Sequence, residues 1–227
     1  MAKKIIRDIR LLKGGMKNGF GEDVTTYFVH KKLNAITQRI VMKLREKEFS
    51  FGEYDHLYIH FIPSSVAQNM HLSDKVDRYH PWLRNCYVPI DAELYDHLRE
   101  PESYDAIVRW IGTVLTTYFA SEDFDEARIL ACVQEATEQG EGMTMKFKEK
   151  SSAKRKAVIY LRYLDTCRFY PLLQVYDLEE QLLFEKDLPE TVTLDCLGEI
   201  QVSTKRVTIK TRKNAYTTQM APLTFEY

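Results

Sequence analysis

Residues 54–62 read Tyr-Asp-His-Leu-Tyr-Ile-His-Phe-Ile, and their side chains alternate in character along the chain. In an extended strand, successive side chains point to opposite faces. The large apolar members share one face: Leu57, Ile59 and Phe61. The polar and aromatic members share the other: His56, Tyr58 and His60. The alternation predicts a β-strand with one buried face, and Pro63 is expected to end it.

Toward the N-terminus, residues 4–13 predict a first strand and residues 14–21 predict a loop. A helix is expected after this loop, with Asp23 as its N-cap. The apolar residues of this helix recur at helical spacing and define its buried face: Leu33, Ile36, Ile40, Val41 and Leu44.

Toward the C-terminus, residues 64–83 predict a long polar loop or a short helix. Residues 86–90 predict a short strand that Pro89 interrupts. Asp91 and Ser121 are the expected N-caps of two of the helices that follow. Three helices are predicted in this part of the chain: Asp91 to about Arg99, 102–119, and Ser121 to Gly140.

From Met143 onward, short alternating segments and turns replace the helical pattern. Six strands are predicted there: 143–148, 157–164, 169–176, 181–186, 200–203 and 207–211. The sequence therefore predicts an α+β fold, with N-terminal strands and acidic helices followed by a C-terminal antiparallel β-meander. The expected division is 1–140 and 141–227, at Gly140-Glu141-Gly142, and these parts are either two domains or two layers of one domain.

The composition is that of a globular protein, with 227 residues, 44% hydrophobic and 29% charged. A net charge of −1 gives no overall attraction to nucleic acid or membrane. Residues 1–12 have no apolar core of a signal peptide, and no run approaches the roughly 18 apolar residues that a spanning helix needs. The four cysteines form no CxxC pair and are expected to be reduced thiols: Cys86, Cys132, Cys167 and Cys196. These features predict a cytoplasmic protein.

Signs of catalysis, metal binding or cofactor binding are weak. Gly14 and Gly19 have the spacing of a phosphate-binding loop, but Phe20 and Gly21 stand where such a loop needs lysine and a hydroxyl. On one strand, His56 and His60 lie about 13 Å apart at about 3.3 Å per residue, too far to share a zinc ion. No nucleophile motif accompanies Ser64 or Cys86. The sequence therefore assigns no catalytic, metal-binding or cofactor-binding residue.

The distribution of charge distinguishes the two halves of the chain. Between Asp91 and Glu141, thirteen acidic residues stand against three arginines. Residues 146–156 carry six basic residues and one acid, and residues 205–213 carry five basic residues and no acid. One interpretation is that these are solvated faces, with lysines protecting strand edges from aggregation. The other is that the acidic helices dock a basic protein partner, because complementary charge speeds association and selects the partner.

The second interpretation names candidate partner-binding residues. Seven are acids on the predicted helices, and four come from the polar strand face and the segment after it: Glu93, Asp96, Glu100, Glu122, Asp123, Asp125, Glu126, His56, Tyr58, His60 and Trp82. The basic segments 146–156 and 205–213 could contact anionic ligands, although they lack the regular aromatic residues of single-strand binders.

Residues 54–98 resemble bacterial immunity proteins of polymorphic toxin systems. The resemblance rests on three segments: Tyr58-Ile59-His60-Phe61, His80-Pro81-Trp82 and Val88-Pro89-Ile90-Asp91. It implies a cytosolic, non-enzymatic protein that binds one cognate toxin domain and blocks it.

The sequence leaves three functions open. The first is an immunity protein that binds and neutralises a toxin. The second is an enzyme that acts on a phosphate-bearing substrate through the loop 14–21 and the histidines His56, His60 or His80. The third is a β-rich binding module that uses the basic strands.

Overall fold

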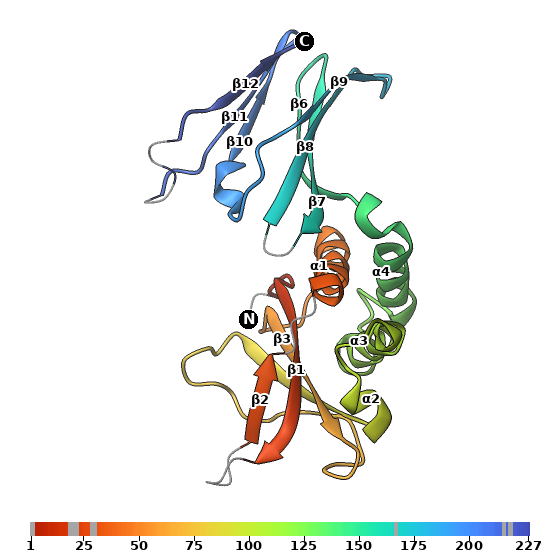
Figure 1. Cartoon of the computed structure of the whole chain (residues 1–227). Helices are drawn as coiled ribbons and strands as arrows, with labels where there is room; N and C mark the ends of the chain where they lie inside the picture. Colours follow the sequence, from red (N-terminus) through yellow and green to blue (C-terminus); the bar gives the residue numbers. More distant parts are fainter. Residues whose placement is uncertain (1–2, 18–22, 28–30, 166–167, 215–216, 218–219) are drawn as a thin grey trace. The chain divides into compact units, whose positions relative to one another are not determined.

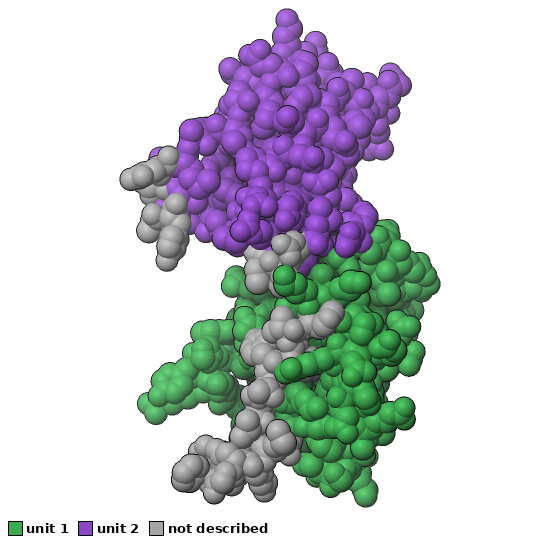
Figure 2. Space-filling model, in the orientation of Figure 1, with its two compact units in different colours: residues 1–140 green, residues 141–227 purple. Residues whose placement is uncertain are grey.

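The computed structural model describes residues 3–17, 23–27, 31–165, 168–214, 217 and 220–227. Packing divides the chain into two compact units, Met1–Gly140 and Glu141–Tyr227 (Figure 2). In the described residues, the first unit combines a sheet with helices that pack on it, and the second unit consists mostly of strands. The α+β prediction is therefore confirmed. None of the helices in the described ranges is long and apolar enough to span a membrane.

The first unit is built on a mixed five-stranded sheet with the order β2-β1-β3-β5-β4. Three central strands run parallel, and each edge strand runs antiparallel to its neighbour. The strands in chain order are β1 (Asp8–Lys17), β2 (Asp23–Tyr27), β3 (His56–Pro63), β4 (His71–Leu72) and β5 (Leu83–Ile90).

Register explains which face of this sheet is buried. Ile59 on β3 pairs with Leu11 on β1 and with Cys86 on β5, so these three side chains share a face. All three are buried, as are their neighbours Leu57 and Phe61 on the same face. The face predicted from the alternation in residues 54–62 is therefore the core face of the sheet.

The described residues contain four α-helices, in chain order α1 (Lys31–Glu46), α2 (Ala92–Asp96), α3 (Tyr104–Phe119) and α4 (Glu126–Gln139). Short 3-10 turns precede α3 and follow α4, at η1 (Pro101–Ser103) and η2 (Gly140–Gly142). Figure 1 shows α2, α3 and α4 on one side of the sheet. Helix α1 connects β2 to β3 and packs against both α4 and β1.

Charged and aromatic contacts connect α1 and the segment after it to α4 and the loop before α4. Lys43 of α1 is buried and forms ion pairs with Glu46 at 3.1 Å and Glu135 of α4 at 2.8 Å. Phe49, directly after α1, lies edge-on to Phe51 and to Phe124, with ring centroids 5.5 and 4.9 Å apart. This junction fixes the turn that leads from α1 into β3.

Several predicted boundaries are wrong. Asp23 begins β2 and does not cap a helix, because α1 starts at Lys31. The predicted loop 14–21 is strand as far as Lys17, and residues 18–21 lie outside the described residues. Because a strand and not a helix follows it, the strand–loop–helix setting of a phosphate-binding loop is missing.

Two further boundaries differ from the sequence predictions. The N-cap of α4 is Asp125, whose carboxylate accepts the Arg128 N–H, and Ser121 lies in the preceding turn. Strand β5 runs through Pro89 without interruption. Proline lacks a backbone donor, but β4 pairs with β5 only at Cys86 and Tyr87, so Pro89 lies beyond that pairing.

The described part of the second unit forms two antiparallel sheets. The first has the order β6-β7-β8-β9 and the second the order β10-β11-β12. The strands are β6 (Met145–Ser151), β7 (Lys156–Asp165), β8 (Arg168–Tyr176), β9 (Leu182–Asp187), β10 (Glu199–Val202), β11 (Arg206–Lys210) and β12 (Leu223–Glu226), with a 3-10 turn η3 (Leu194–Cys196) before β10.

The two sheets of this unit bury their facing side chains. Ile159 pairs with Leu173 in the first sheet and Val207 pairs with Phe225 in the second, and the three aliphatic side chains are fully buried. The ring centroids of Phe184 on β9 and Phe225 on β12 lie 6.1 Å apart, and this contact connects the two sheets. The predicted meander is thus split into two layers, and β12 was not predicted.

Close backbone packing at Gly198 sets the entry to β10. A Cβ placed there would lie 2.5 Å from the Lys210 carbonyl oxygen and 2.7 Å from the Arg212 nitrogen. Nearby, the Lys148 ammonium donates to the Leu197 and Gly198 carbonyls at 2.8 and 2.7 Å. Burial lowers the pKa of Lys148 below its ordinary value.

Candidate functional site

The polar face of β3 carries three of the predicted partner-binding residues. His56 is half-buried, and its Nδ1 lies 2.6 Å from the Asp55 carboxylate. The Arg10 guanidinium lies 5.3 Å from the centre of the Tyr58 ring. His60 is buried, with Nε2 at 2.9 Å from the Asn85 side-chain oxygen. These rings therefore already make contacts within the first unit.

Tyr87 extends this aromatic face along β5. Its ring stacks against His60 at 4.8 Å and against His71 at 5.2 Å, measured between ring centroids. Trp82 lies in the segment before β5 and is 38% exposed, with His80 edge-on to it at 5.3 Å. Of the four predicted residues outside the helices, Trp82 is the most accessible to a partner.

Metal-binding and nucleophilic side chains do not converge in the described part of the chain. Within those residues, no three His, Cys, Asp or Glu side chains are placed to hold a metal ion together. Cys86, Cys132 and Cys196 are free thiols, and Cys167 lies outside the described residues. Burial raises the pKa of Cys86 to about 12, so its thiol stays protonated at neutral pH.

The acids at the start of α4 form the first acidic cluster: Glu122, Asp123, Asp125 and Glu126. Two of them have structural roles. Asp123 pairs with Lys3, and this contact lowers the Asp123 pKa. Asp125 caps α4 by accepting the Arg128 N–H at 2.8 Å. Glu122 and Glu126 are exposed, so they are the members available to a partner.

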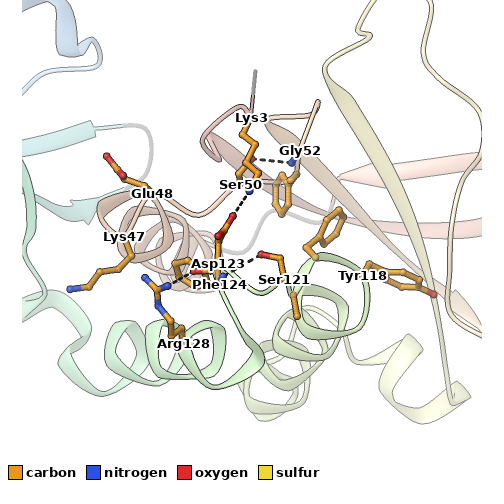
Figure 3. Close-up of a pocket in the computed structure, with 13 residues that line it drawn as sticks. Lys3, Lys47, Glu48, Ser50, Gly52, Tyr118, Ser121, Asp123, Phe124 and Arg128 are labelled. Atoms are coloured by element: carbon orange, nitrogen blue, oxygen red, sulfur yellow. Dashed lines mark hydrogen bonds and ion pairs between the residues drawn. The ribbon is translucent and has the colours of Figure 1, made fainter. Parts of the chain in front are cut away.

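A hollow of about 480 Å³ lies beside this cluster, between the turn after α1 and the loop before α4 (Figure 3). Lys3, Lys47 and Arg128 line it together with Asp123 and Glu48. The Arg128 guanidinium donates to the Asp123 carbonyl and lies 4.3 Å from the centre of the Phe124 ring. Lys3 from the N-terminal segment and Arg128 of α4 itself therefore offset part of the acidic charge that the sequence places here.

The second acidic cluster surrounds α2 and η1. A hollow of about 450 Å³ is lined by four acids and by Leu94, His97, Ser103 and Ala106; the acids are Asp91, Glu93, Glu100 and Glu102. Asp91 caps α2 through the Leu94 N–H at 2.8 Å. Among the described residues that line this hollow, His97 alone can carry positive charge. Asp96 is exposed on α2 but does not line the hollow.

His97 makes the charge of this hollow depend on pH. Its Nδ1 lies 2.9 Å from the Glu100 carboxylate, and this hydrogen bond raises the His97 pKa above its ordinary value. Protonation of His97 removes one unit of net negative charge from the hollow. A basic ligand is therefore attracted most strongly when His97 is neutral.

A third feature, which the sequence did not predict, is a groove of about 660 Å³ between α3 and α4. Val108, Gly112, Leu130 and Val133 provide an apolar floor. Leu130 is 49% exposed, whereas Val133 beside it in the floor is buried. Charged side chains line the groove beside this floor: Asp105, Arg109 and Glu138.

No family model, curated protein or solved structure matches this chain. The roles of the sheet face, the two acidic clusters and the groove must therefore come from their geometry and charge. The groove could have been noticed from Leu130, which follows Glu126 by one helical turn and is the large apolar residue on the acidic side of α4.

Proposed function

We propose that this chain is a cytoplasmic, non-enzymatic binding protein of the immunity type, which docks a basic partner domain through its helices. The observation that carries the proposal is the groove between α3 and α4, with its apolar floor, its acids Asp105 and Glu138, and the half-exposed Leu130. An apolar centre surrounded by polar residues is the usual anatomy of a specific protein interface.

The acidic hollow at α2 and η1 supports the same partner chemistry. Ala106, which lines that hollow, follows Asp105 of the groove directly in α3, so the two features adjoin on one helix. Seven acids and two arginines occupy residues 104–139. An apolar side chain of the partner would fill the groove, and its cations would meet the acids. Charge of this kind raises the association rate and selects the partner.

The test pairs the chain with the product of the gene adjacent to its own. If that product is a toxin, co-expression of this chain should restore growth, and the two proteins should co-purify. Leu130→Arg should abolish both effects, because it places a charge in the apolar floor of the groove. Leu178→Arg is the matched control, since Leu178 is 69% exposed on the second unit.

Both variants should retain the circular dichroism spectrum and unfolding midpoint of the wild type. If the adjacent product is neutralised equally well by the Leu130→Arg protein, the groove is not the interface. If no complex forms and growth is not restored, the immunity proposal is wrong.

A further inference from the structure

The structure divides the cations of the second unit into engaged and available groups. In the two basic segments, five side chains already bind acids or carbonyl groups: Lys146 with Glu149, Lys148 with Leu197 and Gly198, Lys156 with Glu180, Lys210 with Glu199, and Arg212 with Asp195. Six other cations of these segments form no ion pair within the described residues: Lys150, Lys154, Arg155, Lys205, Arg206 and Lys213. Four of the six, Lys154, Arg155, Lys205 and Arg206, belong to two tight turns.

The two turns have the same sequence pattern and the same hydrogen bonds. Residues 152–155 read Ser-Ala-Lys-Arg and residues 203–206 read Ser-Thr-Lys-Arg. The Ser152 N–H donates to the Arg155 carbonyl at 2.8 Å, and the Ser203 N–H donates to the Arg206 carbonyl at 2.8 Å. The hydroxyl of each serine also donates to the carbonyl of the arginine in its own turn, at 3.3 Å in the first turn and 3.1 Å in the second. One turn joins β6 to β7, and the other joins β10 to β11.

Tyr227 brings the two turns together at one end of the second unit (Figure 1). Its hydroxyl donates to the Ser203 carbonyl at 2.8 Å, and its N–H donates to the Lys205 carbonyl at 3.2 Å. Burial raises the pKa of Tyr227, and the nearby positive charge of Arg155 opposes that rise. The Tyr227 ring also stacks on Phe184 of β9, with ring centroids 5.7 Å apart, and Phe184 pairs through Val175 with Ala157, just after the turn 152–155, so Tyr227 lies near both turns.

The space and the unused donors at this end suit an anion. A hollow of about 430 Å³ is lined by Ser203, Lys205, Arg206, Glu226 and Tyr227. Lys154, Lys205 and Arg206 are exposed. The Arg155 Nε is buried and has no hydrogen-bond partner among the described residues, although its NH1 donates to the Lys154 carbonyl at 2.8 Å.

We propose that the turns 152–155 and 203–206, the twin turns, bind the sugar–phosphate backbone of a nucleic acid strand, each turn contacting two phosphates, one with its lysine and one with its arginine. A backbone with regularly repeated charge can be held in the same way by two copies of one Ser-x-Lys-Arg turn. Such binding depends on local cations and counterion release, so a net charge of −1 does not oppose it. This site is independent of the proposed docking of a basic protein to the first unit.

The same end of the second unit argues against a flat anionic membrane as the ligand. The turn between β8 and β9 is acidic, with Asp177, Glu179 and Glu180, and Glu180 reaches Lys156 at 3.5 Å. A membrane surface that covered the basic turns would also approach these carboxylates and be repelled by them. A single strand can follow the basic turns without crossing the acidic one.

The experiment measures the affinity of the full chain for a short labelled oligothymidylate by fluorescence anisotropy across a salt series. Four phosphate contacts on a single strand predict about 50-fold weaker binding at about 200 mM than at about 50 mM salt. The exposed pair Lys154→Gln and Lys205→Gln should weaken binding and reduce the slope of log affinity against log salt by about 1.4. Adding Arg155→Gln and Arg206→Gln should remove the remaining specific binding.

A matched control removes the same charge elsewhere on the second unit, at Lys146, Lys186, Lys210 and Lys213, each changed to Gln. This control should keep most of the affinity, and circular dichroism should show that both quadruple variants are folded. Equal losses in the two quadruple variants would overturn the proposal. So would equally tight binding of polyglutamate, or binding of phosphatidylserine vesicles in place of the oligonucleotide. Competition by duplex and single-stranded DNA but not by polyglutamate would support it.

Discussion

At the scale of single residues, the structure shows how a buried charge is stabilised, which composition does not show. Lys43 is buried in a helix that the sequence predicts to be amphipathic. Burial alone would lower the Lys43 pKa, but the carboxylates of Glu135 and Glu46 raise it above its ordinary value. The same contact with Lys43 lowers the Glu135 pKa. The charge of Lys43 is thus retained because its partners lie on α1 and α4.

Gly198 gives a prediction at this scale. Gly198→Ala should lower the free energy of unfolding by about 1–3 kcal/mol, because the new methyl group would overlap the backbone of Lys210 and Thr211. Gly142→Ala is the control, since nothing lies within 4 Å of a Cβ at that position. Urea unfolding of the two variants measures the difference, and equal stabilities would show that the β10 entry adjusts freely.

The elements of secondary structure were predictable where one face is buried and the neighbours are close in sequence. The alternation in residues 54–62 predicts β3, and the strands of the second unit follow from short hairpins. The sequence predicts a helix start where β2 lies, because Asp23 is a favourable N-cap. Pairing of β2 with β1 makes this segment a strand, and such pairing depends on tertiary structure and not on local sequence. The α3–α4 groove also depends on packing between helices, so periodicity in one helix cannot predict it.

The N-cap of α4 provides a prediction at the scale of elements. Asp125→Ala should destabilise the protein by about 0.5–2 kcal/mol, because the Arg128 N–H loses its acceptor. Glu122→Ala is the control, since Glu122 is exposed in the preceding loop and caps nothing in the described structure. Thermal unfolding followed by circular dichroism distinguishes them. A larger loss in Glu122→Ala would place the start of α4 nearer Ser121.

The acidic hollow at α2 predicts a pH response. By NMR, the His97 ring should titrate with a midpoint above its ordinary value of about 6.5. Because the folded-state pKa is raised, the contribution of His97 to stability is present below about 6.5 and is lost as the pH rises through the folded-state pKa. Glu100→Gln should lower the midpoint more than Glu93→Gln, since Glu100 is the principal cause of the shift. An unchanged midpoint in Glu100→Gln would contradict the hydrogen bond.

At the scale of the whole molecule, the structure separates charge that is already neutralised from charge that is available. Lys3 and Arg128 contact part of the acidic cluster at α4, whereas His97 is the one potential cation among the described residues that line the hollow at α2 and η1. In the second unit, acids or carbonyl groups engage many of the cations, and the twin turns retain theirs. Counting charges along the sequence indicated both segments but could not make this distinction, because it does not show which charges are paired; Lys3, for example, reaches Asp123 from a distant part of the chain.

The rate of association with the proposed basic partner should depend on the acids of the hollow at α2 and not on the total number of acids in the chain. Glu93→Gln, Glu100→Gln and Glu102→Gln together should slow association, and the effect should diminish between about 0.1 M and 1 M salt as the Debye length falls from about 10 to 3 Å. The matched triple control is Glu53, Glu179 and Glu199, all exposed. Stopped-flow mixing with the adjacent gene product measures the rates. Equal rates for the two triple variants would exclude electrostatic steering by this hollow.

The different connections of the two units have a consequence for the order of folding. Parallel pairing of β1 with β3 must wait until residues as distant as Asp8 and His56 meet, with α1 between them, whereas β6 to β9 close through successive hairpins. Non-local pairing slows folding. Both tryptophans, Trp82 and Trp110, lie in the first unit. After dilution from denaturant, tryptophan fluorescence should therefore recover more slowly than the far-ultraviolet signal of the strands, and during that interval the core face of β3 is exposed to aggregation and to chaperones.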